Sequence, residues 1–348
     1  MFTNNIKTIT VFFAFVCALA GCRQTVDVHF DPSVSDYTPV VREILENHPE
    51  GNITLRFGKG VYPFYPEKAP EEFLNVSNND SGNKRVAFLL KNMKNVRIAG
   101  DETDFMFHGS MTPFAVKGSE NVEISGNVFY DSPKGSLITD SNRNLKWDAS
   151  VRWNLNIHHN TFVNFMTRST KAAWMNTRYI PGGSEASIHD NIWINTKDAD
   201  DVNRAMNALG WDARNIQGGD GSGKVVFNIY NNWTTNDPYL KGGQPFNNNA
   251  FNATSNSPGK WQKTWKDELD TYYPAGLDEL KVHCDPELKA TDLMVSPNPQ
   301  HFVGAKPSHL DHHTDKGIDG LYYQQTEKVL NSAIYKSGAG APRLRNGK

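Results

Sequence analysis

A short motif that recurs along the chain constrains its fold more than any other feature of the sequence. The motif reads apolar residue, any residue, Ile, two further residues, then Asn or Asp, and an aromatic residue usually follows two positions later. It occurs at residues 96–101, 122–129, 155–162, 186–193 and 227–232. The Asn or Asp positions lie 26, 33, 31 and 41 residues apart, so the motif repeats at irregular intervals.

Each copy of the motif predicts a β-strand followed by a turn. Two apolar residues at spacing two place both side chains on one face of a strand. The Asn or Asp then marks the turn, because its short polar side chain tolerates a left-handed backbone and can bond a neighbouring coil. A single unit cannot bury its own apolar face, so the units must stack into a solenoid.

The irregular spacing favours one kind of solenoid. In a right-handed parallel β-helix, the pectate-lyase-like all-β fold, loops differ in length while the strands keep their place in each coil. We therefore expect a β-helix with one internal stack that contains Ile98, Ile124, Ile157, Ile188 and Ile229. A β-sandwich with Asn-rich turns is the alternative interpretation.

The first residues have the layout of a secretory signal. Lys7 precedes an uncharged segment at residues 8–21, which is too short to span a membrane permanently. The segment ends in Leu-Ala-Gly-Cys at residues 19–22 and resembles the bacterial lipobox, in which the cysteine is lipidated. It predicts a lipid anchor at Cys22 and a cell-envelope location on a bacterial membrane, either the outer membrane or facing the periplasm. A plain cleaved signal with an incidental cysteine is the alternative.

The chain divides into a signal peptide, an N-terminal cap, a β-helix and a C-terminal extension. The ranges assigned to them are 1–21, 22–50, 51–240 and 241–348, respectively. Within the cap, residues at helical spacing predict a helix ending near Asn47, and they are Tyr37, Val40, Val41, Ile44 and Leu45. The extension should cover an open end of the solenoid, since exposed strand edges aggregate. The tail after Tyr335 is expected to be disordered or loosely docked.

Charge and composition exclude some partners and favour others. The chain has 36 Lys and Arg against 38 Asp and Glu and no run of basic residues, so it has no electrostatic attraction to nucleic acid. Aromatic residues make up 11% of the sequence. In polar strands they suit a groove that stacks on sugar rings, although most are expected to pack inside the coils. The predicted partner is therefore a glycan or oligosaccharide, and the oligomeric state is left open.

Several segments between residues 57 and 126 resemble a known family. The segments are 57–69 (FGKGVYPFYPEKA), 76–80 (VSNND), 85–88 (RVAF), 105–114 (FMFHGSMTPF) and 120–122 (ENV). They resemble, in the same order, the N-terminal coils of bacterial α-1,3-galactosidases, which are blood-group-B-active glycoside hydrolases. The resemblance implies a right-handed parallel β-helix that removes terminal α-linked galactose with inversion and without a metal. Later segments resemble Bacteroidetes β-helix proteins of polysaccharide utilisation, at residues 191–195 (NIWIN) and 290–293 (ATDL).

An acidic cluster directly after the fourth copy of the motif is the candidate catalytic centre. An inverting glycosidase needs a carboxylic acid and a carboxylate base, and crowded like charges raise one pKa above the other. The cluster at residues 198–201 falls at a predicted turn, where carboxylates can converge. We assign the acid and base to Asp200 and Asp201, with Asp212 and then Asp220 as further partners. A solvated turn rich in Asp is the non-catalytic interpretation.

Basic residues in consecutive predicted coils support a different chemistry. A polysaccharide lyase needs a base that removes the proton α to a uronate, and a cation that neutralises the carboxylate. The candidates, which are also the candidate substrate-binding residues of a hydrolase, are Arg152, His158, Arg168 and Lys171. His108, in the galactosidase-like segment, is a further candidate for binding substrate at the rim. A structural imidazole is the alternative for His158.

Three functions stay open on sequence alone. A glycosidase on terminal galactosides is favoured, a lyase on uronate-containing glycans is second, and a non-catalytic glycan-binding or structural solenoid is third. The third function predicts aromatic side chains on an outer face. No cofactor and no metal site are predicted. Histidines near the C-terminus have a spacing that could bind a transition metal, or they belong to a polar surface loop, and they are His301, His309, His312 and His313.

Overall fold

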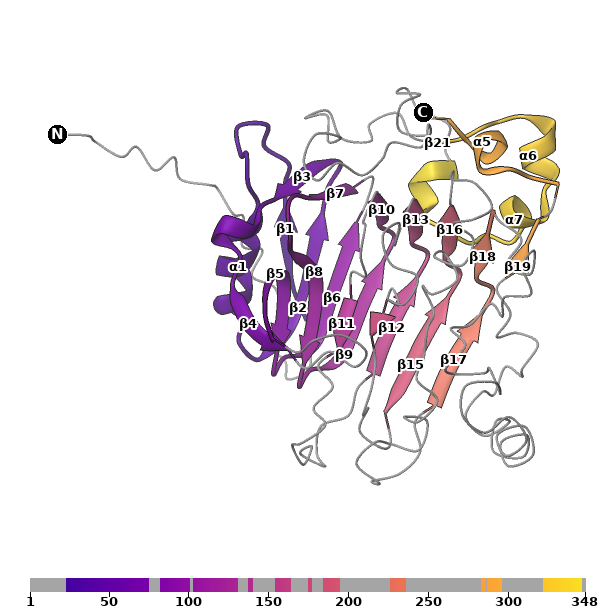
Figure 1. Cartoon of the computed structure of the whole chain (residues 1–348). Helices are drawn as coiled ribbons and strands as arrows, with labels where there is room; N and C mark the ends of the chain where they lie inside the picture. Colours follow the sequence, from indigo (N-terminus) through magenta and orange to yellow (C-terminus); the bar gives the residue numbers. More distant parts are fainter. Residues whose placement is uncertain are drawn as a thin grey trace.

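The protein is a right-handed parallel β-helix whose strands stack along one axis (Figure 1). This computed structural model describes residues 23–74, 82–100, 103–130, 137–139, 154–163, 175–176, 184–194, 226–235, 283–285, 287–295 and 322–345. Each described coil passes through one strand of sheet A, one of sheet B and, in the earlier coils, one of sheet C. The fold expected from the repeated motif is therefore confirmed.

The three sheets are built from short strands that are far apart in the sequence. Sheet A has the order β1 (Gln24–Val28), β2 (Gly51–Phe57), β6 (Lys94–Gly100), β9 (Glu120–Ser125), β12 (Asn154–His158), β15 (Glu185–His189) and β17 (Val226–Tyr230). Sheet B has the order β3 (Gly60–Phe64), β7 (Thr103–Phe107), β10 (Val128–Tyr130), β13 (Thr161–Val163), β16 (Ile192–Ile194), β18 (Trp233–Thr234) and β19 (His283–Cys284). Sheet C contains β4 (Glu71–Leu74), β5 (Gly82–Lys91), β8 (Thr112–Lys117), β11 (Leu137–Thr139) and β14 (Met175–Asn176), and only its β4–β5 pair is antiparallel.

The isoleucines of the repeated motif form one continuous row in sheet A. Strand pairing aligns, one after another, Ile98, Ile124, Ile157, Ile188 and Ile229. The same row continues backwards through Leu55 to Val26 in the first strands. The first four isoleucines are almost completely buried, and branched side chains stacked in this way fill the interior of the coil. The predicted internal stack is confirmed by this register.

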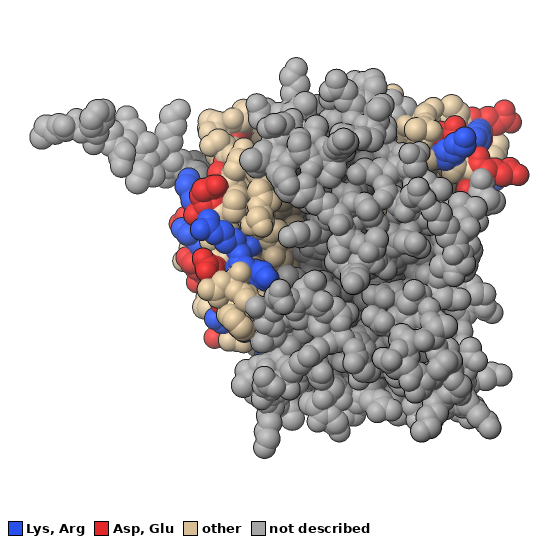
Figure 2. Space-filling view, viewed as in Figure 1, with Lys and Arg blue, Asp and Glu red and all other residues tan. Residues whose placement is uncertain are grey.

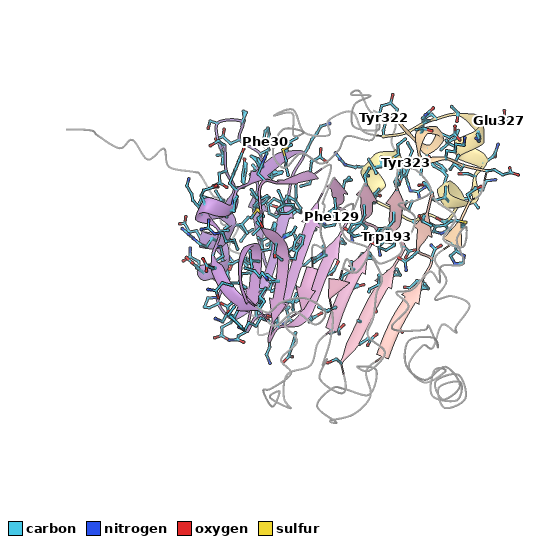
Figure 3. All side chains as sticks on the ribbon, in the orientation of Figure 1. Phe30, Phe129, Trp193, Tyr322, Tyr323 and Glu327 are labelled. Atoms are coloured by element: carbon cyan, nitrogen blue, oxygen red, sulfur yellow. The ribbon has the colours of Figure 1, made fainter. Side chains whose placement is uncertain are left out.

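Aromatic residues also stack inside the coil, one layer from each strand of sheet B (Figure 3). The rings of Phe129 and Phe162 lie 4.9 Å apart at 8°, and those of Phe162 and Trp193 lie 5.0 Å apart at 11°. All three side chains are at most 2% exposed. In the described residues most of the aromatic side chains are thus core residues, as expected, and the large exposed ones are Phe30 and Phe73.

The asparagines of the motif form a buried ladder at the corner between sheets A and B. Asn127, Asn160, Asn191 and Asn232 are at most 1% exposed. The amide oxygens of Asn160, Asn191 and Asn232 each accept hydrogen bonds from the asparagine of the preceding coil. The bonding to neighbouring coils is as predicted. The left-handed backbone is not on the asparagine, however, but one residue earlier, on Gly126, His159, Asp190 and Asn231. The buried asparagine needs its side chain directed at the next coil, so the preceding residue makes the turn.

Helices cover the solenoid at its beginning and along one side (Figure 1). The predicted N-terminal helix is α1 (Thr38–Glu46), which buries Val40, Val41, Ile44 and Leu45. Late in the chain follow α5 (Ala290–Leu293), β20 (Met294–Val295), β21 (Tyr322–Tyr323), α6 (Glu327–Asn331), α7 (Ala333–Lys336) and a 3-10 helix at Pro342–Arg345. None of the helices in the described residues is long and apolar enough to cross a bilayer.

The tail after Tyr335 is docked closely, which corrects the expectation of a loose end. Ala339, Ala341 and Leu344 are completely buried, and they belong to one apolar cluster with Val128 and Ile192 on the outer side of sheet B. Gly340 has φ 84° and passes so close to sheet B that a Cβ there would lie 2.9 Å from Ile192. Small residues in the tail therefore permit close packing, a role that composition alone does not reveal.

Charged side chains of both signs are interspersed over the N-terminal part of the surface (Figure 2). Glu72 pairs with both Lys91 and Lys117, at 3.0 and 2.6 Å. Along α1, Arg42 lies 3.8 Å from Glu46. This pairing leaves mixed charge on the described surface around α1, in agreement with the near-balanced composition.

Candidate functional site

Polar side chains cover the outer face of sheet A, because every second residue of its strands points away from the core. They form two rows across the strands. One row contains Arg97, Glu123, Asn156, Ser187 and Asn228. The other contains Ala99, Ser125, His158, His189 and Tyr230. The solenoid thus turns single residues of distant motif copies into neighbours.

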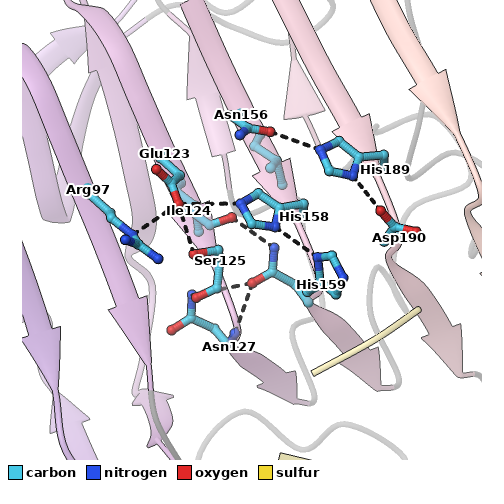
Figure 4. Close-up of polar contacts among 12 residues, drawn as sticks. Arg97, Glu123, Ile124, Ser125, Asn127, Asn156, His158, His159, His189 and Asp190 are labelled. Carbon is cyan, nitrogen blue, oxygen red and sulfur yellow. Dashed lines mark hydrogen bonds and ion pairs between the residues drawn. The ribbon is translucent and has the colours of Figure 1, made fainter. Parts of the chain in front are cut away.

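The turn after each strand adds a third row. His159 and Asp190 follow β12 and β15 with φ values of 52° and 54°, a left-handed conformation that few residues other than glycine, asparagine and aspartate adopt readily. The buried asparagine ladder fixes the corner, so these two side chains leave successive coils at the same place. We use the name histidine cluster for the group formed by Glu123, His158, His159, His189, Asp190 and Tyr230, of which Figure 4 labels the first five.

Glu123 is a carboxylate surrounded by positively charged or proton-donating groups. Its oxygens lie 3.0 Å from Arg97 Nε, 3.3 Å from His158 Nε2 and 3.7 Å from Arg23 Nη1. The hydrogen bond from His158 and the charge of Arg97 outweigh burial and lower the pKa of Glu123 below its ordinary value. Glu123 is therefore ionised and accepts hydrogen bonds at neutral pH.

Three rings stack face to face along the solenoid axis. The centroids of His158 and His189 lie 5.0 Å apart at 2°, and those of His189 and Tyr230 lie 4.6 Å apart at 7°. Because the ring faces cover one another, the ring edges with their nitrogens and hydroxyl are presented outward. Burial, together with the charge of Asp190, raises the pKa of Tyr230, so its phenol stays protonated at neutral pH.

Asp190 is held by the preceding residue of its own coil and by the following coil. His189 Nδ1 lies 2.6 Å from Asp190 Oδ2, and Asn231 donates its amide to the other carboxylate oxygen. Burial raises the pKa of Asp190, but these hydrogen bonds outweigh it and bring the pKa below its ordinary value. Burial lowers the pKa of His159, which favours its neutral imidazole. The backbone N–H of Gly340 donates to the carbonyl of Asp190 at 2.7 Å, so the C-terminal tail also supports this turn.

The histidine cluster supplies ionised carboxylates and neutral imidazole, not a carboxylic acid. A glycosidase needs one carboxyl group whose pKa is raised so that it can protonate the leaving group. Both carboxylates of the cluster have lowered pKa values. A general acid therefore has to come from outside the cluster. The cluster can instead bind hydroxyl groups or a cation, since donor atoms of His159, His189 and Asp190 all lie within 4.8 Å of one another.

The structure brings some of the sequence-predicted residues into this site and separates others from it. His158 belongs to the cluster and faces outward, while His159 is held in the turn. His108 lies at the end of β7 in sheet B, where its ring stacks on Tyr65 at 4.2 Å and 1°. The remaining candidates lie outside the described residues, and they are Cys22, Arg152, Arg168, Lys171, Asp200, Asp201, Asp212, Asp220 and the four C-terminal histidines.

Glu123, His189 and Asp190 were not singled out by sequence reasoning. The signal that identifies them is the alignment of the motif copies with one another. In that alignment, the column directly after the recurring Ile holds His158, His189 and Tyr230. The next column holds His159 and Asp190. Polar residues with titratable side chains in equivalent columns of a solenoid become spatial neighbours.

Comparisons with known proteins point to one group of enzymes. The chain matches no model of a known protein family. Alpha-1,3-galactosidase A of Shewanella woodyi is 37% identical over 105 residues, which is 29% of this chain and 17% of that protein. Alpha-1,3-galactosidase B of Phocaeicola vulgatus is 36% identical over 83 residues, which is 23% of this chain and 14% of that protein.

A longer match has lower identity. Alpha-1,3-galactosidase B of Bacteroides thetaiotaomicron is 23% identical over 210 residues, which is 54% of this chain and 34% of that protein. The chain thus spans about a third or less of the length of these curated relatives. The resemblance noted in the sequence is confirmed, and part of this β-helix is similar to bacterial alpha-1,3-galactosidases.

Proposed function

We propose that this protein is a glycoside hydrolase that removes terminal α-linked galactose from a glycan by an inverting acid/base mechanism. The observation that carries the proposal is the similarity to proteins named alpha-1,3-galactosidase, at 34–38% identity over about a quarter to a third of the chain. The outer face of sheet A adds support, because its ring edges, amides and carboxylates present the donors and acceptors that sugar hydroxyls need.

The catalytic pair in this proposal is Asp200 and Asp201, with Asp212 as the next partner. An inverting enzyme holds its two carboxyl groups roughly 6.5–9.5 Å apart, so that a water molecule fits between the base and the sugar. The lowered pKa values of Glu123 and Asp190 support an acid outside the histidine cluster. The acidic segment at residues 198–201 follows β16 in sequence.

The contacts of Glu123 favour hydrolysis over the lyase alternative. A lyase needs a cation that is available to neutralise a uronate carboxylate. On the described face of sheet A, the charge of Arg97 is instead neutralised by Glu123, which also contacts His158. The non-catalytic alternative predicts aromatic side chains on an outer face and no convergent acids. On the outer face of sheet A, Tyr230 stacks on His189, and the carboxylates of Glu123 and Asp190 lie on the same face.

The proposal also includes a lipid anchor at Cys22. Its support is the lipobox-like segment at residues 19–22. Fractionation of cells that express the wild type and Cys22→Ser tests this part. The variant should leave the membrane fraction, and unchanged membrane partitioning would contradict the anchor.

The activity is tested with a panel of α-galactosides and uronate polymers. We expect release of galactose that appears first as the β-anomer in proton NMR, because the mechanism inverts the anomeric centre. Asp200→Asn and Asp201→Asn should each slow turnover by about a hundredfold to ten-thousandfold, the usual contribution of a general acid or base. Glu287→Gln, which removes an exposed carboxylate near the C-terminus, is the matched control.

The possible outcomes separate the three functions. Full activity in both variants would move the catalytic pair elsewhere, with Asp212 and Asp220 next to be replaced. Release of an ultraviolet-absorbing unsaturated product from a uronate polymer would replace the hydrolase by the lyase. Binding of a galactoside without turnover by the wild type would replace both enzymes by a binding module.

A further inference from the structure

The turns after β12 and β15 bring three metal-binding side chains together. One nitrogen from each of His159 and His189 and one carboxylate oxygen of Asp190 lie within 4.8 Å of one another. Two imidazoles and a carboxylate are a common ligand set for first-row transition metals. We propose that these three residues bind a divalent transition-metal ion, with Zn²⁺ as the best fit. This site goes beyond the proposed hydrolase, whose acid/base mechanism requires no metal.

The backbone holds the two turns in register before any ion binds. His159 and Asp190 share a left-handed conformation at equivalent positions of adjacent coils. Beneath them, the amide of Asn160 donates to Asn191 Oδ1 at 3.2 Å, and both asparagines are completely buried. A metal site benefits from such a rigid support, because the ligands lose little freedom when the ion binds.

The hydrogen bonds of His159 leave one of its nitrogens ready to coordinate. Ionised Glu123 accepts from His158 Nε2, at 3.3 Å, so in a neutral ring His158 Nδ1 is an acceptor. His159 Nδ1 lies 2.9 Å from that atom and must therefore donate its proton to it. The lone pair of His159 Nε2 has no hydrogen-bond partner in the described residues and is available to a cation.

His189 presents its Nδ1 to Asp190 at the same turn. His189 Nε2 lies 3.2 Å from Asn156 Oδ1, and Nδ1 lies 2.6 Å from Asp190 Oδ2. These two contacts fix the ring plane and place a ring nitrogen beside a carboxylate oxygen. Asn156 is thus placed like the outer residues that orient ligating histidines.

The nature of the ligands favours Zn²⁺ among the divalent ions. Imidazole nitrogen suits Zn²⁺ and its neighbours, whereas Mg²⁺ and Ca²⁺ prefer sets made only of oxygen. Three protein ligands leave a fourth position to water or to a hydroxyl group of a bound molecule. All three side chains are partly exposed, so an ion can reach them from solvent.

The experiment is a Zn²⁺ titration of the full chain against a chromophoric chelator. Because the C-terminal histidines offer competing ligands, the parent protein carries His301→Ala, His309→Ala, His312→Ala and His313→Ala. We expect one tightly bound ion per chain, and Co²⁺ in its place should show the visible absorption of a four-coordinate site. The ligand variants are His159→Asn, His189→Gln and Asp190→Asn, and asparagine at the two turn positions tolerates their left-handed backbone.

Each ligand variant should weaken Zn²⁺ binding by more than about a hundredfold, beyond the roughly ten- to hundredfold loss expected for Asn156→Ala, which only orients a ligand. His29→Ala removes an exposed histidine near the N-terminus and should leave the affinity unchanged. A parent protein that binds no Zn²⁺, or ligand variants that bind it as tightly as the parent, would overturn the proposal.

Discussion

Two rows of asparagines in sheet A use the same side chain for different purposes. The buried row follows the strands and contains Asn127, Asn160, Asn191 and Asn232, and the amides of its two middle members bond to both neighbouring coils. The other row begins the strands, faces solvent more, and contains Asn52, Asn95 and Asn121. Each of these three has φ between 53° and 55° and shares a single amide–amide bond with the next. Hydrogen-bonding capacity selects asparagine in the first row, and backbone conformation selects it in the second.

This difference shows what a repeated residue in a solenoid contributes. A buried polar side chain stabilises the coil only while its partners remain bonded, because each unsatisfied partner costs about 1–3 kcal/mol. An asparagine selected for its backbone conformation can be replaced by another residue that tolerates that conformation. The same amino acid is therefore indispensable in one row and replaceable in the other.

Asn160→Ala tests the buried row and should have the largest effect. The change removes two bonds from Asn127 to Asn160 Oδ1, and two bonds that Asn160 Nδ2 donates, to Ile124 O and to Asn191 Oδ1. We expect a loss of about 3–5 kcal/mol in the free energy of unfolding, because buried partners remain unsatisfied. Chemical denaturation measures the loss. Asn160→Gly should be no better than alanine, and a rescue by glycine would show that conformation matters there too.

Asn95→Ala tests the exposed row and should have a smaller effect. Alanine in a left-handed backbone should cost about 1 kcal/mol of unfolding free energy, because its Cβ crowds the carbonyl oxygen. Asn95→Gly should restore stability to within about 0.5 kcal/mol of the wild type, since glycine accepts this conformation. The same denaturation measurement applies to both variants. Equal losses for alanine and glycine would contradict the conformational role of this row.

Glu123→Gln tests a contact on the outer face of sheet A, in contrast to the buried ladder. It should have the smallest effect on the free energy of unfolding. Glu123 has a lowered pKa in the folded protein, so its contribution to stability is present above the unfolded pKa and is lost as pH falls through the folded value. Between about pH 5 and pH 3 the wild type should therefore lose roughly 0.5 kcal/mol more stability than the variant. Denaturation curves across this range measure the difference.

Glu71→Gln, which removes an exposed carboxylate from β4, is the matched control for that measurement. A Glu123→Gln protein with the same acid response as the wild type would show that solvent screens the contacts of Glu123 with Arg97 and His158. The buried ladder would then account for the polar stabilisation of this part of the sheet.

The periodicity of the sequence predicts which side chains fill the interior of this solenoid. It predicts far less well the backbone conformation of the turns and the contacts of the C-terminal tail. The isoleucine row follows from spacing alone, because two apolar residues on one face of a strand must face the interior of the coil. The left-handed residue was assigned to Asn160 instead of His159, since sequence gives the turn but not which of its two residues changes conformation. The docking of Ala341 on Thr161 joins residues 180 positions apart, and no local pattern encodes such a contact.

The candidate site divides in the same way. His158 is predicted from the sequence, because it lies in a copy of the motif and an imidazole can act as a base or bind substrate without a partner. Glu123 and Asp190 become notable only when coils are stacked and the carboxylates meet the imidazoles of other copies. Single residues that acquire a role through stacking are visible in an alignment of the repeats, not in a search along the chain.

The docked C-terminal tail has a consequence for the order in which the protein folds. Each coil of sheet A pairs with the coil before it, so these contacts can form while the chain is still being synthesised. The outer side of sheet B depends instead on residues 322–345, which bond Arg343 to Asp104 across 239 positions. Contacts of such high sequence separation form slowly. We therefore expect a partly folded solenoid, in which the apolar outer side of sheet B is uncovered, to persist until the tail has been synthesised. This apolar surface is the one that a chaperone would protect.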